Sequence, residues 1–180
     1  GKIFCIIGKS SSGKDTIYKK LLKNPTLQLK RIVSYTTRPI RAREQEGVEY
    51  YFVNEDIMEC LHKDNKNIES RSYDTVYGLW YYFMAKDDQI NLDKFNYLII
   101  GTLESYIKIR GYFGQDKVVP IYIDLDDGER LTRALQREKN QSEPRYEEMC
   151  RRFLADAKDF SVENLKQAGI IKHFYNNNLK

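Results

Sequence analysis

The residues most able to do chemistry lie near the start of the chain, where an apolar run meets glycine, serine and lysine. Residues 3–7 are apolar, and Gly8, Gly13 and Lys14 follow with four residues between the two glycines. A strand that ends in such a loop, before a helix that begins near the lysine, exposes the N–H groups of the first helical turn. Those groups and the lysine ammonium attract phosphate oxygens, so the pattern predicts a phosphate-binding loop.

The residues after the lysine favour this interpretation and add one departure from the usual pattern. Ile17, Leu21 and Leu22 recur at helical spacing, whereas an ordinary Ser/Gly loop with an exposed lysine is the alternative. The pattern expects Ser or Thr after the lysine as a Mg²⁺ ligand, and this chain has Asp15 and then Thr16. A carboxylate is an oxygen ligand that Mg²⁺ accepts, so Asp15 is the candidate metal ligand. Its other possible role is to complement the dipole of the helix.

A second segment of phosphate-seeking side chains lies at 34–43, which reads SYTTRPIRAR. Arginine offers a planar fork that matches phosphate oxygens, and Ser, Thr and Tyr supply neutral donors, although a solvated basic loop is the alternative. Two such groups predict two phosphorylated ligands, a donor triphosphate and an acceptor. The two ligands would repel each other, and a second cluster of arginines between 130 and 152 could offset that repulsion.

No motif for a general base is evident, and His62 and His173 stand alone in the sequence. A phosphate acceptor needs no base, because a phosphate monoester with a second pKa near about 6 is already an anionic nucleophile at neutral pH. Catalysis then depends on positioning and on charge stabilisation by Lys14, Mg²⁺ and arginines.

Apolar runs and helical periods alternate along the chain, which predicts an α/β fold with a parallel sheet and right-handed crossovers. The expected core strands are 3–7, 29–33, 97–100, 118–123 and 170–175. Helices are expected from 14, over 103–112, over 128–138 and over 146–168. Strands at 47–53, 68–73 and 79–83 and a short helix at 54–61 fill the middle of the chain.

Composition predicts one globular domain. The 180 residues are 41% hydrophobic and 13% aromatic, which suffices for one core. No apolar window approaches about 18 residues and no signal peptide precedes the first strand, so we expect a cytoplasmic protein without membrane contact. The three cysteines lie far apart and support neither a disulfide framework nor a metal site. The net charge of +4 is small and no RNA-binding motif appears, which disfavours nucleic-acid binding.

The phosphate-binding loop and the segments after it resemble guanylate kinases over nearly the full length of the chain. Beyond the loop, the matching residues are Ser34, Tyr35, Thr36, Thr37, Arg38, Pro39, Arg41, Gly47, Glu49, Tyr50, Phe52, Ile68, Glu69, Tyr77 and Gly78. The resemblance implies a three-layer fold of the P-loop NTPase type with a central parallel sheet. It divides the domain into a core (1–33, 95–136 and 152–180), a small mixed α/β subdomain for the nucleoside monophosphate (about 34–83) and a helical lid (about 137–150).

The resemblance also implies an activity and a role for individual residues. The reaction would be GMP with ATP to give GDP and ADP, a step of purine metabolism, with Mg²⁺ as cofactor. The ATP-binding residues would be Gly8, Ser10, Ser11, Ser12, Gly13, Lys14, Asp15, Thr16 and Asn176, and the catalytic residues Lys14, Arg38, Arg137 and Arg152. The acceptor's phosphate would be held by Ser34, Arg38, Arg41, Tyr50 and Tyr77. Glu69 would accept hydrogen bonds from N1–H and the 2-amino group of guanine, as a carboxylate can.

Five positions depart from the family pattern. In the loop, Ser11 occupies the position of a glycine, and Asp15 occupies the position of a Ser or Thr. Leu79 replaces a residue whose hydroxyl contacts guanine, and Ile100 and Thr102 replace the two aspartates of an Asp-x-Asp motif. A site that leaves polar groups of the base unpaired discriminates poorly, although Glu69 still favours guanine because it would repel the unprotonated N1 of adenine. Kinases for another nucleotide or for a sugar phosphate, and an interaction module without catalysis, therefore stay open as alternatives.

Overall fold

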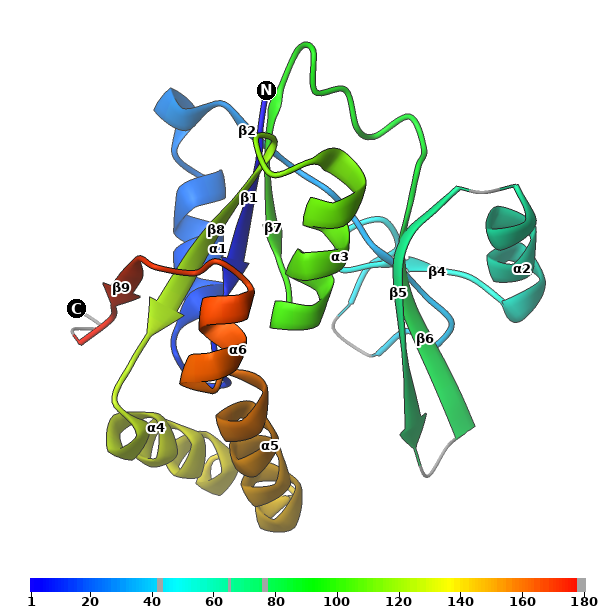
Figure 1. The fold of residues 1–180 in the computed structure, drawn as a ribbon. Coiled ribbons are helices and arrows are strands. Elements are labelled where there is room, and N and C mark those ends of the chain that lie inside the picture. The colour runs from blue at the N-terminus through cyan, green and yellow to red at the C-terminus, as the bar shows by residue number, and fades with distance from the viewer. Residues whose placement is uncertain (42–43, 65, 76–77, 178–180) are drawn as a thin grey trace.

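The computed structural model describes residues 1–41, 44–64, 66–75 and 78–177, which contain two sheets (Figure 1). In the larger sheet every neighbouring pair of strands is parallel. In spatial order its strands are β2 (Leu29–Arg31), β7 (Asn96–Ile100), β1 (Ile3–Ile7), β8 (Val118–Asp124) and β9 (His173–Tyr175). The predicted α/β fold with a central parallel sheet is confirmed.

Strand β1 lies in the middle of this sheet because its side chains are apolar on both faces. Ile3, Cys5 and Ile7 belong to one cluster of buried residues, whereas Ile6 belongs to a second cluster. Successive side chains of a strand point to opposite faces, so a run without polar residues must be covered on both sides. Helix α1 covers the Ile6 face, and α3 and α6 cover the other (Figure 1).

The helices of the core follow the strands in the expected alternation. They are α1 (Lys14–Leu22), α3 (Leu103–Phe113), α4 (Asp127–Lys139), α5 (Tyr146–Asp159) and α6 (Val162–Gln167), and a 3-10 turn, η1 (Pro25–Leu27), follows α1. Among the described residues, none of the helices has the length and apolar character needed to cross a membrane.

The prediction of one helix over 146–168 is wrong, because the chain breaks at Phe160 and Ser161. Phe160 is buried and its ring stacks on Tyr122 at 5.7 Å between centroids. Ser161 is extended, and its hydroxyl accepts a hydrogen bond from the N–H of Asn164, which starts α6. A serine cap and a core contact thus turn the chain, although the apolar period continues through the break.

The smaller sheet is mixed and supports the hydroxyl- and arginine-rich segment. In spatial order it contains β4 (Tyr51–Phe52), β3 (Tyr35–Thr36), β6 (Gly78–Ala85) and β5 (Asn67–Thr75), and β3 and β4 are its parallel pair. Helix α2 (Glu55–Lys63) begins after Asn54, whose side chain accepts from the N–H of Ile57.

Three strands are shorter than predicted, because other groups take the backbone hydrogen bonds at their ends. The strand expected over 170–175 covers only 173–175, and the N–H of Ile170 donates to the carbonyl oxygen of Leu165 instead. The strand expected over 47–53 covers only 51–52, because Gly47 adopts a left-handed conformation with φ of 70° and the N–H of Val48 closes a turn onto Gln45. The strand expected over 29–33 ends at Arg31. Beyond it, Val33 donates its N–H to the side chain of Gln89 instead of to a neighbouring strand.

The two sheets meet at α3. The Lys108 ammonium donates to the carbonyl oxygen of Ser70 at 2.7 Å, and Arg71 of β5 reaches Thr102 at the start of α3. The β5–β6 hairpin extends from this junction past the end of the larger sheet (Figure 1). Because parallel strands end at a common edge, the loops after β1, β7 and β8 lie at the edge where ligands of open α/β sheets bind.

Candidate active site

The loop between β1 and α1 leaves the start of a helix without a side-chain cap. Gly13 is the N-cap residue of α1 with φ of 87°, and no side chain in the described part of the chain caps that terminus. Ser11 also has a positive φ, 63°, at a position where the sequence resemblance leads us to expect glycine. A Cβ on Gly8 would lie 2.5 Å from the carbonyl oxygen of Ile123, so only glycine fits there. The arrangement leaves backbone N–H groups of the first turn of α1 without a side-chain cap, as helix termini that bind anions have.

Helices α4 and α5 hold the outer part of this loop through charged side chains. The N–H of Ser10 donates to a carboxylate oxygen of Asp156 at 2.8 Å, and Arg130 donates to the carbonyl oxygen of Ser10 at 3.1 Å. Arg130 is almost completely buried, and its guanidinium also contacts Asp156 and Asp127. The position of the loop is therefore coupled to the two helices that follow β8.

Asn176 reaches the same loop from the end of the chain. Its side-chain amide donates to the carbonyl oxygen of Ser12 at 2.8 Å, and its backbone N–H donates to Asp124 at 3.0 Å. Strand β9 ends just before it, so the parallel pairing of β8 with β9 delivers the amide to the loop. The fold thus brings Asn176 against the predicted ATP-binding residues.

Arg38 is the most constrained of the predicted acceptor residues. Only 3% of its side chain is exposed, and its two terminal nitrogens donate to the two carboxylate oxygens of Glu44 at 2.7 and 2.6 Å. Its other donations go to the Tyr82 hydroxyl and the Pro39 carbonyl oxygen. Hydrogen bonds from the Arg38 guanidinium lower the pKa of the Glu44 carboxyl, so the pair is ionic at neutral pH.

Tyrosine rings connect Arg38 to strand β5. The guanidinium carbon of Arg38 lies 5.2 Å from the ring centre of Tyr50, and the Tyr50 and Tyr82 rings contact edge to face at 5.5 Å. Tyr82 contacts Tyr73 at the same separation. Cationic and aromatic groups therefore run continuously from the arginine-rich segment to β5.

Glu69 on β5 is buried and paired with Arg71 two residues away. The Nε and Nη2 atoms of Arg71 donate to the two carboxylate oxygens of Glu69 at 3.1 and 3.2 Å, and only 1% of the Glu69 side chain is exposed. Burial raises the pKa of the Glu69 carboxyl, and the charge of Arg71 opposes that rise. Alternation along the strand puts both residues and Tyr73 on one face.

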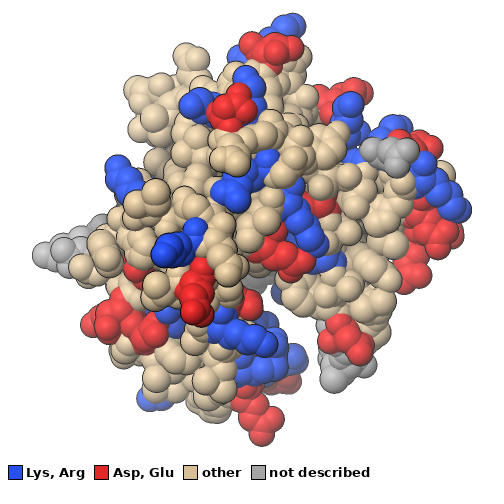
Figure 2. Space-filling view, in the orientation of Figure 1, with Lys and Arg blue, Asp and Glu red and all other residues tan. Residues whose placement is uncertain are grey.

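The remaining predicted residues are more open to solvent. Lys14 and Ser34 are half-buried, and Asp15, Thr16, Arg41, Arg137 and Arg152 are exposed. Arg152 donates to Glu148 at 2.7 Å along α5. Tyr77 lies outside the described residues. Figure 2 shows Lys and Arg side chains gathered over the α4–α5 body, beside a hollow that separates this body from the β5–β6 hairpin.

Known proteins resemble this chain in sequence and in architecture. The family model described as Guanylate kinase matches residues 1–98. A guanylate kinase of Mycoplasma mobile is 32% identical over 180 residues, covering 97% of this chain and 86% of that protein. The chain belongs to the guanylate kinase family. The crystal structure of guanylate kinase from Anaplasma phagocytophilum superimposes with a TM-score of 0.61 and 25% identity, covering 99% of this chain and 78% of that one.

Membership of the guanylate kinase family confirms the predicted enzyme class, a phosphotransferase of the nucleoside monophosphate kinase type. It does not test the role of any single side chain. The site described above also contains residues to which the sequence analysis gave no individual role, namely Glu44, Arg71, Arg130 and Asp156.

Only some of these residues carried a signal in the sequence. Glu69 and Arg71 stand two apart in a predicted strand, a spacing that places them on one face. Glu44 follows Arg38 by six residues, and Asp156 is 146 residues from Ser10. The sequence gives no sign that these residues are partners, because only the tertiary fold brings them together.

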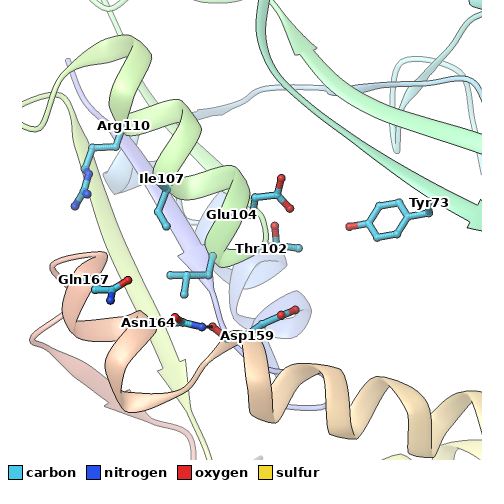
Figure 3. Close-up of a pocket in the computed structure, with 9 residues that line it drawn as sticks. Tyr73, Thr102, Glu104, Ile107, Arg110, Asp159, Asn164 and Gln167 are labelled. Atoms are coloured by element: carbon cyan, nitrogen blue, oxygen red, sulfur yellow. Dashed lines mark hydrogen bonds between the residues drawn. The ribbon is translucent and has the colours of Figure 1, made fainter.

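Two cavities border the site in the described part of the chain. One, of about 520 Å³, lies between β5, α3 and α6, and Figure 3 shows Tyr73 on one side of it, facing Thr102 and Glu104 of α3. The other, of about 430 Å³, lies beside the loop and is bordered by Lys9, Asp127 and Tyr175. Both volumes are in the range of small-molecule sites in proteins.

Proposed function

We propose that the chain transfers the γ-phosphate of ATP to GMP, the reaction of the family to which it belongs. The supporting observation is the uncapped start of α1, which follows a buried parallel strand and carries Lys14 at its first position. Free N–H groups and one ammonium at the ligand-binding edge of the sheet suit the terminal phosphates of a nucleoside triphosphate.

We propose that the donor is held by the loop, by the first turn of α1 and by Asn176. The proposed ATP-binding residues are Gly8, Ser10, Ser11, Ser12, Gly13, Lys14, Asp15, Thr16 and Asn176. The hydroxyls of Ser11 and Ser12 are buried and have no hydrogen-bond partner among the described residues, so they are donors that a phosphate would satisfy. Asn176 contacts the loop at the carbonyl oxygen of Ser12, which supports the proposal that it borders the donor.

The residues present fit a magnesium ion that is bound mostly by nucleotide phosphates and water. Mg²⁺ in such sites takes one or two protein oxygens, and no cluster of three or more His, Cys, Asp or Glu occurs among the described residues. Asp15 is exposed in the first turn of α1, next to Lys14, and would supply the one carboxylate oxygen. When bound there, Mg²⁺ would neutralise negative charge on the donor phosphates.

We propose that Ser34, Arg38, Arg41, Tyr50 and Tyr77 hold the phosphate of GMP and that Glu69 takes part in base recognition. Arg38 already uses four of its five N–H groups within the chain, so it can offer one to a phosphate. Arg41 is exposed, and its described hydrogen bonds, both with Glu44, use its backbone N–H and carbonyl oxygen and not its guanidinium. The guanidinium of Arg41 would therefore be free to bind the phosphate, whereas that of Arg38 is already held within the chain.

Phosphoryl transfer between the two ligands then needs alignment and positive charge more than acid-base chemistry. The acceptor phosphate is already anionic near pH 7, so no carboxylate has to remove a proton. Two facing phosphates repel by about 4 kcal/mol per pair of unit charges at 4 Å and an effective dielectric of about 20. Lys14, Arg38, Arg137 and Arg152 are proposed to offset that repulsion in the transition state.

The division into subdomains follows from the same proposal. Residues 34–83 would carry the acceptor, since they form the smaller sheet with α2, and 137–150 would act as a lid between α4 and α5. Exposed arginines on these two helices would approach the donor when the ligands are bound. The core would then be formed by 1–33, 95–136 and 152–180.

The test is an ADP-release assay with ATP and a panel of acceptors: GMP, AMP, dTMP and ribose 5-phosphate. We expect turnover with GMP to exceed turnover with the other acceptors, and the Lys14→Ala variant to serve as the inactive control. Equal rates with all acceptors would refute the assignment of GMP. Calorimetric binding of GMP without any ADP release would refute the phosphoryl transfer and support an interaction module.

A further inference from the structure

In the pair formed by Glu69 and Arg71, both carboxylate oxygens of Glu69 already accept hydrogen bonds, so guanine could bind them only in place of Arg71. A bidentate arginine uses both oxygens of a carboxylate in its plane, and Arg71 does so at 3.1 and 3.2 Å. Guanine would present N1–H and its 2-amino group to the same two oxygens in the same manner. The two donors therefore compete for one acceptor group.

Burial makes this pair hard to separate. The side chains of Glu69 and Arg71 are 1% and 15% exposed, so moving the arginine away would leave a buried carboxylate without its charge partner until a base replaced it. The backbone also favours the pair, since both residues lie on one face of a strand that runs through the β5–β6 ladder. Burial and the strand geometry therefore both favour the ion pair between Glu69 and Arg71.

Arg71 keeps donors that the pair does not use. A guanidinium has five N–H groups, and the described contacts take Nε–H, one of Nη2 and one of Nη1. The Nη1 contact goes to the hydroxyl of Thr102 at 3.4 Å, which is long for a hydrogen bond and easily exchanged. One donor on each terminal nitrogen is left among the described residues, which together can meet two neighbouring acceptors.

The surroundings of Arg71 belong to the acceptor side of the site. Its partner across the β5–β6 ladder is Tyr82, whose hydroxyl accepts from Arg38 at 3.1 Å. Thr102, which it contacts, borders the cavity of about 520 Å³ opposite Tyr73 (Figure 3). A nucleotide whose phosphate lies near the arginine-rich segment would therefore bring its base toward Arg71.

We infer that Arg71 selects the base by donating to O6 and N7 of guanine, and that Glu69 positions Arg71. This inference rests on the proposed function. Arginine forks recognise guanine in this way because O6 and N7 are adjacent acceptors, whereas adenine presents N7 beside a 6-amino donor. The pair would then supply the selectivity that is lost with the hydroxyl at the position of Leu79 and with the carboxylates at the positions of Ile100 and Thr102.

Base analogues distinguish recognition of O6 and N7 by Arg71 from direct recognition of N1–H and the 2-amino group by Glu69. IMP keeps O6 and N7 but lacks the 2-amino group, and 7-deaza-GMP keeps N1–H and the 2-amino group but lacks N7. We expect kcat/KM for IMP to stay within about 3-fold of GMP. For 7-deaza-GMP we expect a loss within the about 5- to 150-fold range of one bidentate base contact. A larger loss of kcat/KM with IMP than with 7-deaza-GMP would mean that Glu69 binds the base directly, and it would overturn the inference.

The variant Arg71→Met shows whether the loss belongs to this arginine. We expect it to turn over GMP and 7-deaza-GMP at equal, reduced kcat/KM and to discriminate less against AMP. Arg110→Gln is the matched control, because it removes a half-buried guanidinium on a different element, α3. In this variant the order of kcat/KM among GMP, IMP and 7-deaza-GMP should not change. A penalty for 7-deaza-GMP that persists without Arg71 overturns the inference.

Two further measurements keep the test decisive. If Arg71→Met folds poorly, Arg71→Met/Glu69→Met removes both charges at once and should fold while still failing to distinguish GMP from 7-deaza-GMP. If the unaltered protein releases no ADP with GMP, the proposed function fails on its own. Calorimetric titration with the three nucleotides then still decides whether the base is read through N7.

Discussion

Removing the Arg38 side chain should destabilise the fold even without a ligand, because this arginine is part of a buried ion pair. The side chains of Arg38 and Glu44 are 3% and 15% exposed and share two short hydrogen bonds. Deleting one partner of a buried pair costs about 3–5 kcal/mol, since the other charge stays buried alone. Glu44 keeps some contact with water, so we expect Arg38→Met to lower the free energy of unfolding by about 3 kcal/mol.

Urea unfolding at pH 7 measures this loss. With a slope of about 1.5–3 kcal/mol per M, the midpoint should fall by about 1 to 2 M. Arg38→Met/Glu44→Met should be no less stable than Arg38→Met, which gives a coupling energy of about 2 kcal/mol or more. Arg31→Met, at an exposed arginine with one described contact to Gly47, should change stability by less than about 0.5 kcal/mol.

Two results would refute this reasoning. One is a midpoint for Arg38→Met that stays within about 0.3 M of the unaltered protein at an unchanged slope. The other is a double variant whose loss equals the sum of the two single losses. Either result would mean that the Arg38 fork is held only loosely by Glu44 and is available to a ligand at no cost to the fold.

Three further predictions concern the donor loop, a surface network and the thiols. Lys14→Ala should lower kcat by about 10²- to 10³-fold without changing the urea midpoint, and retained turnover would exclude the loop as the donor site. Hydrogen bonds from two arginines lower the pKa of Glu148 to about 2, so its stabilisation should be complete above about pH 4.5 and be lost as the pH falls through about 2. Because Glu148 is 37% exposed, Glu148→Gln should cost less than about 1 kcal/mol at pH 7, and the cost should shrink as the pH falls below about 4.5. A thiol reagent should modify exposed Cys60 and Cys150 in the folded protein, whereas Cys5, whose thiol pKa is raised by burial, should react only after unfolding.

Local patterns in the sequence were sufficient for most of the architecture. The apolar run at 3–7 could only be a strand covered on both faces, and it lies in the middle of the parallel sheet. Glycine at 8 and 13 predicted the turn into α1, where the backbone does adopt a left-handed conformation at Gly13. These features depend on residues next to one another in the chain, so a single sequence contains them.

Element ends were less predictable, because single side chains decide them. Ser161 starts a new helix within an unbroken apolar period, and Gly47 shortens a strand that reads as continuous. In both cases a cap or a turn competes with a periodic pattern. The outcome depends on what the rest of the fold can bury.

The sequence by itself determined the glycine- and lysine-containing loop before α1, the arginine-rich segment and the family, since each depends on runs of neighbouring residues with their own chemistry. Only the tertiary structure decided which of those charges are already paired. Arg38 is held by Glu44, Glu69 by Arg71, and Ser10 by Asp156. A side chain in a motif offers donors and acceptors, but burial beside a partner determines how many of them stay available to a ligand.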